Sequence, residues 1–522
     1  MKKNYALSFL LVWLTIFSGF AQANKEEIDL AVINKIKQEG LNNSKVMETA
    51  FYLTDVSGPR LSNSPGLKRA SEWVQKTLTQ WGLVNAKLEP WGEFGRGWEI
   101  EKSYLAITAP YYVPVIAAPK AWTPGTNGLV KANVTLINAT KDEDLAQYAG
   151  KLKGQVIITP LPAPMKTSFE ADARRYTEED LAKMLAPVAT RSAPAAADAD
   201  YEKRLAEYRT RLAFRNKLTD FLQQEGASLV LSYRSGTHGT FFTSNGASYA
   251  PDAKPVLPEF EIAGEDYGRI LRLAEAKIPV TLEFESKTRF VEADLKGYNV
   301  VAEIPGTDRK LKSELVMLGG HIDSWHAATG ATDNAAGVAV MMEAVRILKA
   351  VGAKPKRTIR IALWSGEEQG IHGSRGYVKN HFADPATMEL KPEHEKVSAY
   401  FNLDNGTGKI RGIYTQGNEA ITPLFTKWLE PFKDMGATTV TNRNTGGTDH
   451  LSFDAVGIPG FQFVQDPVEY GTRTHHSNQD TYERLQPDDL KQASVIVASF
   501  VYNTAMRQDK LPRKPLPKKK AA

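Results

Sequence analysis

Hydrophobic and polar positions repeat with different periods in successive parts of the chain. From residue 24 to about residue 110 the apolar positions follow a helical period, with a break at Gly58-Pro59-Arg60. Between Val113 and Lys287, short apolar runs are separated by glycine and proline, which is typical of a small β-rich unit. The runs lie at residues 134–137, 156–160, 229–231 and 280–284.

A helical segment interrupts this β-rich unit over about residues 165–225. Tyr201, Leu205, Tyr208 and Leu212 recur at spacings of four, three and four residues, which predicts an amphipathic helix. The helix follows an alanine- and proline-rich stretch at residues 192–197. A solvated helical excursion is the simpler interpretation, and a lid over a substrate is the alternative.

From Tyr298 onward, strand-like and helical patterns alternate. Strands are predicted at residues 314–318, 358–364, 397–403 and 460–464, and helices at residues 334–350, 420–432 and 488–506. The alternation predicts an α/β domain, with a mostly parallel mixed sheet and helices on both faces. We assign residues 24–110 and 291–508 to this domain and residues 111–290 to the β-rich insertion.

Both ends of the chain differ from its body. Met1-Lys2-Lys3, an apolar run at residues 6–20 and the small residues Ala21 and Ala23 form the pattern of a cleavable signal peptide over residues 1–23. The run is too short to span a bilayer, which takes about twenty residues. A basic, proline-rich tail at residues 509–522 is predicted to be disordered. We therefore expect a secreted or periplasmic protein with no membrane span.

Composition excludes one class of partner and one type of metal ligand. The chain carries 65 Lys and Arg against 60 Asp and Glu, a net charge of +5, and the excess lies at its two ends. A body without a basic surface gives no reason to expect nucleic-acid binding. The chain has no cysteine, so that a metal site must use histidine and carboxylate ligands.

Residues suited to such a site follow the predicted strands. Eight of the nine histidines lie between His321 and His476. Asp323 follows His321 by two positions, so both side chains project from the same side of an extended strand end. The polar residues that follow three strands are His321, Asp323, Asp333, Glu367, Glu368 and Asp404, and His475 and His476 come later in the chain.

Charge favours a pair of metal ions at these residues. Two carboxylates about 4 Å apart repel by roughly 4 kcal/mol at an effective dielectric constant near 20. Two divalent cations remove this cost, because Asp333, Glu368 and Asp404 balance all but one of their charges and leave room for a hydroxide. Zinc suits imidazole and carboxylate ligands best, and cobalt or manganese could substitute.

These segments together resemble the zinc-dependent co-catalytic exopeptidases, a family of aminopeptidases and glutamate carboxypeptidases. The resemblance is carried by residues 321–325, 332–334, 367–368, 402–404 and 475–481, with residues 55–61 and 94–98 nearer the start. It spans nearly the whole chain after the signal peptide. It implies the phosphorylase/hydrolase-like fold of zinc exopeptidases and a β-rich insertion that is a protease-associated domain shaping access to the cleft.

The resemblance also implies a role for each residue. It implies two Zn²⁺ ions per chain, one held by His321 and Asp404, the other by Glu368 and His476, with Asp333 bridging them. Glu367 matches the general base, which takes a proton from the attacking water and returns it to the leaving amine. Asp323 matches the carboxylate that orients the imidazole of His321.

Contacts with the substrate are less well defined by the sequence. His475 stands where some family members have a tyrosine, and it is a candidate donor to the oxyanion. His450 is a candidate substrate contact. A substrate carboxylate would need a positioned guanidinium, for which Arg375, Arg443 and Arg473 are candidates.

The sequence thus predicts an exported di-zinc metallopeptidase that acts as an exopeptidase on short peptides or dipeptides. Aminopeptidase, carboxypeptidase and dipeptidase action all remain open, as does a homodimer. Two alternatives stay in view: a single-zinc acyl transferase of the glutaminyl-cyclase type, and a binding ectodomain without catalysis. Zinc content and peptide hydrolysis distinguish them.

Overall fold

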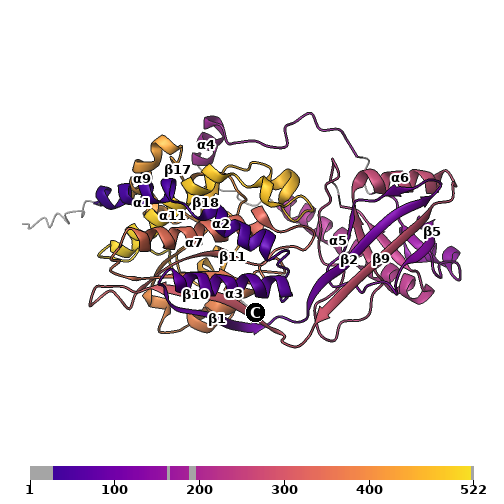
Figure 1. The fold of residues 1–522 in the computed structure, drawn as a ribbon, viewed down its shortest axis with the longest axis horizontal. Helices are drawn as coiled ribbons and strands as arrows, with labels where there is room; N and C mark the ends of the chain where they lie inside the picture. The colour runs from indigo at the N-terminus through magenta and orange to yellow at the C-terminus, as the bar shows by residue number, and fades with distance from the viewer. Residues whose placement is uncertain (1–26, 162–164, 187–194, 235, 519–522) are drawn as a thin grey trace, which may run out of the picture.

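Two eight-stranded sheets form the centres of two adjacent units in the computed structural model (Figure 1). The structure describes residues 27–161, 165–186, 195–234 and 236–518. The predicted signal peptide at residues 1–23 lies outside this range. Among the described residues, no helix is both long and apolar enough to cross a membrane.

The first sheet carries the alternating part of the chain, in the strand order β1-β10-β12-β11-β15-β18-β16-β17. Its central strands β12, β11, β15 and β18 are parallel, and antiparallel pairs flank them. The expected mixed sheet is therefore confirmed. The strands are β1 (Val84–Glu93), β10 (Lys296–Ile304), β11 (Leu315–His321), β12 (Thr358–Trp364), β15 (Val397–Asn402), β16 (Ile410–Tyr414), β17 (Thr439–Thr441) and β18 (Gly460–Gln465).

Helices cover both faces of this sheet, because its central strands are apolar on both sides. In β11, Val316 and Leu318 pack into one core, whereas Leu315 and Met317 pack into the other. The first core holds α1 (Leu30–Asn42), α2 (Val46–Phe51), α3 (Pro65–Gln80), α7 (Ala336–Ala350), α9 (Thr422–Leu429) and α11 (Pro487–Met506). The second holds α8 (His372–His381) and α10 (His450–Asp454).

The second sheet has the strand order β3-β2-β9-β5-β6-β7-β8-β4, and α6 (Gly264–Glu275) packs against it. Its strands are β2 (Gly97–Ala109), β3 (Val113–Pro114), β4 (Ala117–Pro119), β5 (Val130–Leu136), β6 (Val156–Ile158), β7 (Leu229–Ser232), β8 (Glu259–Ile262) and β9 (Thr281–Val291). The long strands β2 and β9 pair from Gly97 opposite Val291 to Ala109 opposite Thr281. They carry the chain out of the first unit and back into it (Figure 1).

The expected boundary of the insertion at residue 111 is wrong. Because β2 already belongs to the second sheet, the insertion begins near Gly97. The helical pattern predicted up to residue 110 ends earlier, since α3 stops at Gln80 and β1 and β2 follow. Pairing with β10 and β9 fixes these strands, a long-range constraint that overrides local periodicity.

The helical excursion divides into two helices with different contacts. The segment with α4 (Glu178–Leu185) packs on the first unit, where Arg411 donates a hydrogen bond to the Tyr176 carbonyl and Thr441 to that of Met184. In α5 (Ala195–Glu225), Leu218 and Leu222 pack against the second sheet. The excursion is thus anchored at both ends.

The tail predicted to be disordered is docked over its described part, residues 509–518. Leu511 is 2% exposed, and its backbone N–H donates to the Ser398 hydroxyl. Arg513 donates hydrogen bonds of 2.8 Å to the carbonyls of His394 and Val397. Proline-rich composition does not prevent docking of an extended segment whose side chains, rather than its backbone, make most of the contacts.

Candidate metal centre

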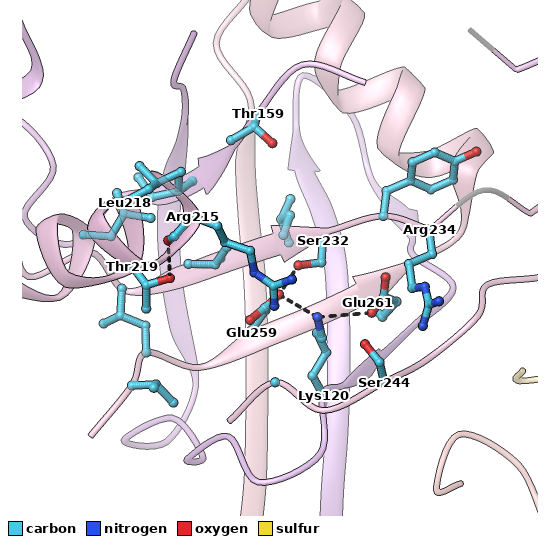
Figure 2. A pocket seen from close by; sticks show the side chains of 18 of the residues that line it. Lys120, Thr159, Arg215, Leu218, Thr219, Ser232, Arg234, Ser244, Glu259 and Glu261 are labelled. Atoms are coloured by element: carbon cyan, nitrogen blue, oxygen red, sulfur yellow. Dashed lines mark hydrogen bonds and ion pairs between the residues drawn. The ribbon is translucent and has the colours of Figure 1, made fainter. Parts of the chain in front are cut away.

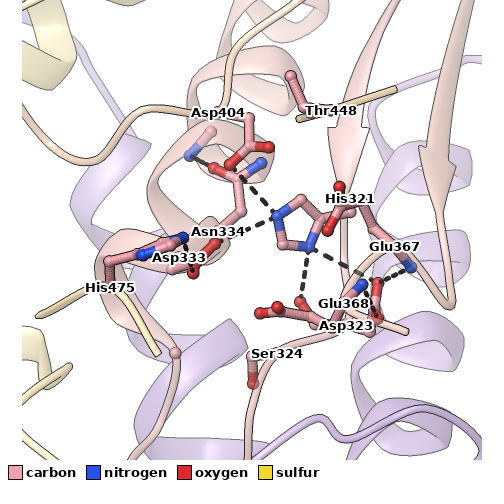
Figure 3. Close-up of polar contacts among 12 residues, drawn as sticks. His321, Asp323, Ser324, Asp333, Asn334, Glu367, Glu368, Asp404, Thr448 and His475 are labelled. Carbon is pink, nitrogen blue, oxygen red and sulfur yellow. Dashed lines mark hydrogen bonds and ion pairs between the residues drawn. The ribbon is translucent and has the colours of Figure 1, made fainter. Parts of the chain in front are cut away.

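The polar residues that follow the parallel strands meet at one edge of the first sheet (Figure 3). His321 is the last residue of β11, Glu367 and Glu368 follow β12, and Asp404 follows β15. Asp333 lies in the turn Ala331–Ala335 that leads into α7. Parallel strands expose their carboxyl ends together, which explains why residues far apart in sequence converge here.

His321 lies among three aspartates at the centre of the cluster (Figure 3). Its Nε2 is 3.2 Å from Asp333 Oδ1 and 3.3 Å from Asp404 Oδ1. Its Nδ1 donates a 3.0 Å hydrogen bond to the backbone carbonyl of Asp323. A carbonyl can only accept, so Nδ1 carries a proton and Nε2 faces the two carboxylates, as a metal-binding imidazole requires.

A second group of donors lies on the other side of Asp333. His476 Nε2 is 2.9 Å from Glu368 Oε2 and 3.3 Å from Asp333 Oδ2. Asp333 therefore turns one oxygen toward His321 and the other toward His476. Ligand atoms of His321, Asp333 and Glu368 lie within 4.8 Å of one another, and so do those of Asp333, His475 and His476.

The cluster carries buried charge that protein groups leave unbalanced. Both carboxylate oxygens of Glu368 and Oδ2 of Asp333 are buried without a hydrogen bond among the described residues. Burial raises the pKa of Glu368 well above its usual range, and the Asp333 carboxylate adds to the effect. Such orphaned acceptors are costly in a dry interior. A pair of cations would satisfy them, so this donor set fits metal ions.

The pKa of His321 leads to the same conclusion. Burial alone would lower this pKa, but the carboxylates of Asp404, Asp323 and Asp333 outweigh burial and raise it well above its usual value. A proton on His321 Nε2 thus does what a metal ion would do, which is to neutralise the surrounding carboxylates.

Glu367 lies beside the cluster and is not one of its close donors. Its side chain is buried, and the residue is 9% exposed. Burial raises its pKa well above the usual range, as do the carboxylates of Asp404, Asp449 and Glu368. A carboxyl group with a raised pKa holds a proton more readily than an ordinary carboxylate, which suits a general base.

Comparison with known proteins identifies the first unit. Residues 299–501 match the model of peptidase family M28. These matched residues, which include all five proposed metal ligands, resemble that family, and we call them the M28 domain. Carboxypeptidase Q of Mus musculus is 28% identical over 497 residues, which cover 94% of this chain and 92% of that protein. The Homo sapiens carboxypeptidase Q is 26% identical, covering 94% of this chain and 90% of its own.

Solved structures agree on the fold. The peptidase M28 precursor from Shewanella amazonensis has a TM-score of 0.65 at 22% identity, covering 94% of this chain and 98% of its own. The zinc aminopeptidase BSAP from Bacillus subtilis has a TM-score of 0.56 at 17% identity, covering 90% and 97%. Both alignments extend beyond the M28 domain to most of the described chain.

Asp323 supports the M28 site differently from the sequence expectation. Its carboxylate lies 3.6 Å from Nδ1 of His321, so its backbone carbonyl rather than its side chain holds the imidazole. The carboxylate instead accepts hydrogen bonds of 3.3 Å from the backbone N–H groups of Glu367 and Glu368 and one of 3.0 Å from Ser62. Asp323 thus positions residues from two strand ends.

Two supporting residues were not assigned a role from the sequence. Asp480 accepts hydrogen bonds from the backbone N–H groups of Thr332, at 2.6 Å, and Asp333, at 3.1 Å. Arg60 is fully buried and donates to four backbone carbonyls, those of Leu53, Ile322, Thr329 and Gly330. The break Gly58-Pro59-Arg60 was the available signal for Arg60.

The insertion also contacts the M28 site. The backbone N–H of Thr243 donates a 2.7 Å hydrogen bond to the carbonyl of His476, and that of Asn478 donates to the carbonyl of Phe241. Asn478 Oδ1 accepts a 2.9 Å bond from the Phe241 N–H. The loop that carries His476 is therefore held from outside the M28 domain, a contact with no sequence signal.

Most of the candidate substrate contacts are buried or have other partners. His450 is fully buried and donates to the Thr445 carbonyl, so it is not available to a substrate in this conformation. Each candidate arginine has another partner: Arg375 the Gly370 carbonyl, Arg443 the Lys183 carbonyl, and Arg473 the carboxylates of Asp172 and Glu469. His475 remains a candidate, since it is 45% exposed and stacks on His476.

A pH effect follows from Asp449, which is fully buried beside the site. Burial raises its pKa from 3.8 to about 7. A carboxyl group whose pKa is higher in the folded than in the unfolded protein stabilises the fold while it is protonated. This contribution is complete below the pKa of the unfolded state and is lost as the pH rises through the pKa of the folded state. In metal-free protein, the stability of Asp449→Asn relative to the unmutated chain should therefore increase as the pH rises from about 5 to about 8.

Thermal unfolding in the presence of a chelator measures this gain. Asp252→Asn, at an exposed position of the insertion, is the matched control and should show no such trend. A stability difference for Asp449→Asn that stays constant or shrinks as pH rises would contradict the prediction.

Proposed function

We propose that this protein is an exported exopeptidase that hydrolyses short peptides or dipeptides with two zinc ions. The single observation that carries the proposal is the position of Asp333 between two groups of donors, one oxygen facing His321 and the other His476. A carboxylate shared in this way is what a paired-metal site needs. The signal-peptide pattern at residues 1–23 supports export.

In this proposal each donor keeps the role that the resemblance implied. His321 and Asp404 would hold one ion, Glu368 and His476 would hold the other, and Asp333 would serve both. Zinc would supply Lewis-acid activation of the attacking water and the peptide carbonyl. Glu367 would accept the proton of that water and deliver it to the leaving amine, and His475 is the candidate donor to the oxyanion.

Relatives support both the zinc and the exopeptidase reaction. The Bacillus subtilis structure is named a zinc aminopeptidase, and the curated relatives over most of the chain are named carboxypeptidase Q. The match to peptidase family M28 supports metallopeptidase activity and peptide substrates. A single-zinc acyl transferase would not need the second group of donors. A binding ectodomain without catalysis would not need Glu367. We therefore favour the exopeptidase over both alternatives.

A set of dipeptides tests the reaction. Free dipeptides should be cleaved, and blocking whichever end the enzyme recognises, the amine by acetylation or the carboxylate by amidation, should abolish cleavage. Liquid chromatography of the products measures both. Cleavage of internal bonds in peptides blocked at both ends would contradict exopeptidase action, and ring closure of amino-terminal glutamine without hydrolysis would favour the acyl transferase.

Metal content tests the assignment of the second ligand histidine. His476→Ala should lower the zinc content from about two ions per chain to about one, because it removes a donor 2.9 Å from Glu368. His475→Ala is the matched control and should keep both ions, since its Nε2 is 3.9 Å from Asp333. Elemental analysis measures both variants, and the reverse pattern would assign the ligand to His475.

Glu367→Gln tests the general base. Amide and carboxylate have the same shape, so zinc content should be unchanged while kcat falls by about 10² to 10⁴. Glu419→Gln, exposed on the surface of the same domain, serves as the control. Full turnover in Glu367→Gln would show that another group accepts the proton.

A further inference from the structure

The insertion contains a cavity of about 550 Å³ that is separate from the metal centre (Figure 2). It lies where β6 and β7 end, against β8, with Leu218 and Leu222 of α5 on one side. The hollow beside the metal ligands is lined by other residues, among them Trp325, Asp333 and His476. The size is that of a small-molecule site.

Charged residues of both signs line this cavity. Lys120 Nζ is 3.1 Å from Glu259 Oε1 and 3.6 Å from Glu261 Oε2. Glu259 Oε1 also accepts a hydrogen bond from Ser232. Glu261 is 0% exposed, yet neither of its oxygens accepts a hydrogen bond from any described residue. A buried carboxylate without donors is costly, and a ligand that supplies them relieves this cost.

Arg234 offers the complementary charge. Its Nη1 donates to the Thr243 carbonyl at 3.0 Å, and no carboxylate lies within 4 Å of it in the described part of the chain. Figure 2 shows its guanidinium on the same side of the cavity as Glu261 and Ser244. Arg215, exposed on α5, extends over Glu259 and adds positive charge. Arg234 lines the cavity but is exposed, so its guanidinium also contacts solvent. The cavity therefore presents a carboxylate that accepts no hydrogen bond and is ion-paired only with Lys120, at 3.6 Å, and a guanidinium without a carboxylate partner among the described residues.

The remaining lining is largely aliphatic, with Ile157, Val230 and Leu257 in addition to the two α5 leucines. This combination selects a class of ligand. An ammonium group satisfies Glu261, a carboxylate satisfies Arg234, and an apolar side chain fits the aliphatic wall.

We propose that this cavity binds an apolar α-amino acid, whose ammonium group pairs with Glu261 and whose carboxylate pairs with Arg234. The site goes beyond the proposed function and does not depend on it. If the exopeptidase proposal holds, the ligand is chemically a reaction product. Burial raises the pKa of Glu261 to about 7, so a ligand ammonium would complete the ionisation of this carboxyl group.

The site is connected to the metal centre by two hydrogen bonds. Arg234 donates to the carbonyl of Thr243, and the N–H of Thr243 donates to the carbonyl of His476. A ligand that draws the Arg234 guanidinium toward itself thus acts on the segment that holds a proposed zinc ligand.

Calorimetric titration with L-leucine tests the site in protein freed of metal by a chelator. One leucine should bind per chain. L-leucinamide, which lacks the carboxylate, and 4-methylpentanoate, which lacks the ammonium group, should each bind at least about tenfold more weakly, because each lacks one of the two charged groups that pair with Arg234 and Glu261. These comparisons use the unmutated protein, so they do not depend on the folding of a variant.

Variants then locate the site. Glu261→Gln and Arg234→Gln should each weaken leucine binding at least about tenfold. Glu275→Gln, exposed on α6 of the same unit, should bind leucine normally. Glu367→Gln should also bind it normally, which distinguishes the cavity from the metal centre. Peptide hydrolysis measured on the same preparations reports on the proposed function separately.

Three outcomes would overturn the proposal. One is the absence of leucine binding at about 10 mM ligand. Another is equal binding of leucine and 4-methylpentanoate, which would indicate a simple carboxylate site. The third is binding that survives Glu261→Gln but requires zinc, which would place leucine in the metal centre as a bound product.

Discussion

The structure depends on holding several carboxylates together in a nearly dry pocket. Asp333, Glu368 and Asp404 converge around His321, and each is almost fully buried. Like charges at such distances oppose folding, so the surrounding structure must fix the arrangement, and the proposed cations would balance its charge. The same unbalanced charge would favour the binding of metal ions in this pocket.

The protein fixes this pocket mainly through backbone groups. Asp480 holds the turn that carries Asp333 by its N–H groups, and Asp323 holds the N–H groups of Glu367 and Glu368. Arg60 donates hydrogen bonds to backbone carbonyls of the loop between His321 and Asp333. These three buried residues mostly act on the backbone. They fix where the ligands lie without competing with a metal for the ligand oxygens.

Local patterns predicted the parts of the molecule that local forces decide. The strand at residues 358–364 and the helix at residues 488–506 match β12 and α11 closely, since continuous apolar runs between turn signals leave few alternatives. Spacing after strand ends also located the donors around Asp333. Periodicity misplaced residues 84–109, because pairing with β9 and β10 decides their conformation. The local sequence likewise does not predict that Arg513 in the tail donates a hydrogen bond to the Val397 carbonyl.

The position of His476 explains why the insertion belongs to the site. The other donors follow strands or the turn into α7, which the sheet itself makes rigid, but His476 lies in a loop after β18. Its neighbours His475 and Asn478 could move with that loop unless something outside held it. Thr243 and Phe241 of the insertion provide that contact through backbone hydrogen bonds. The insertion therefore helps to position one proposed metal ligand, through the segment between β7 and β8 that carries Phe241 and Thr243.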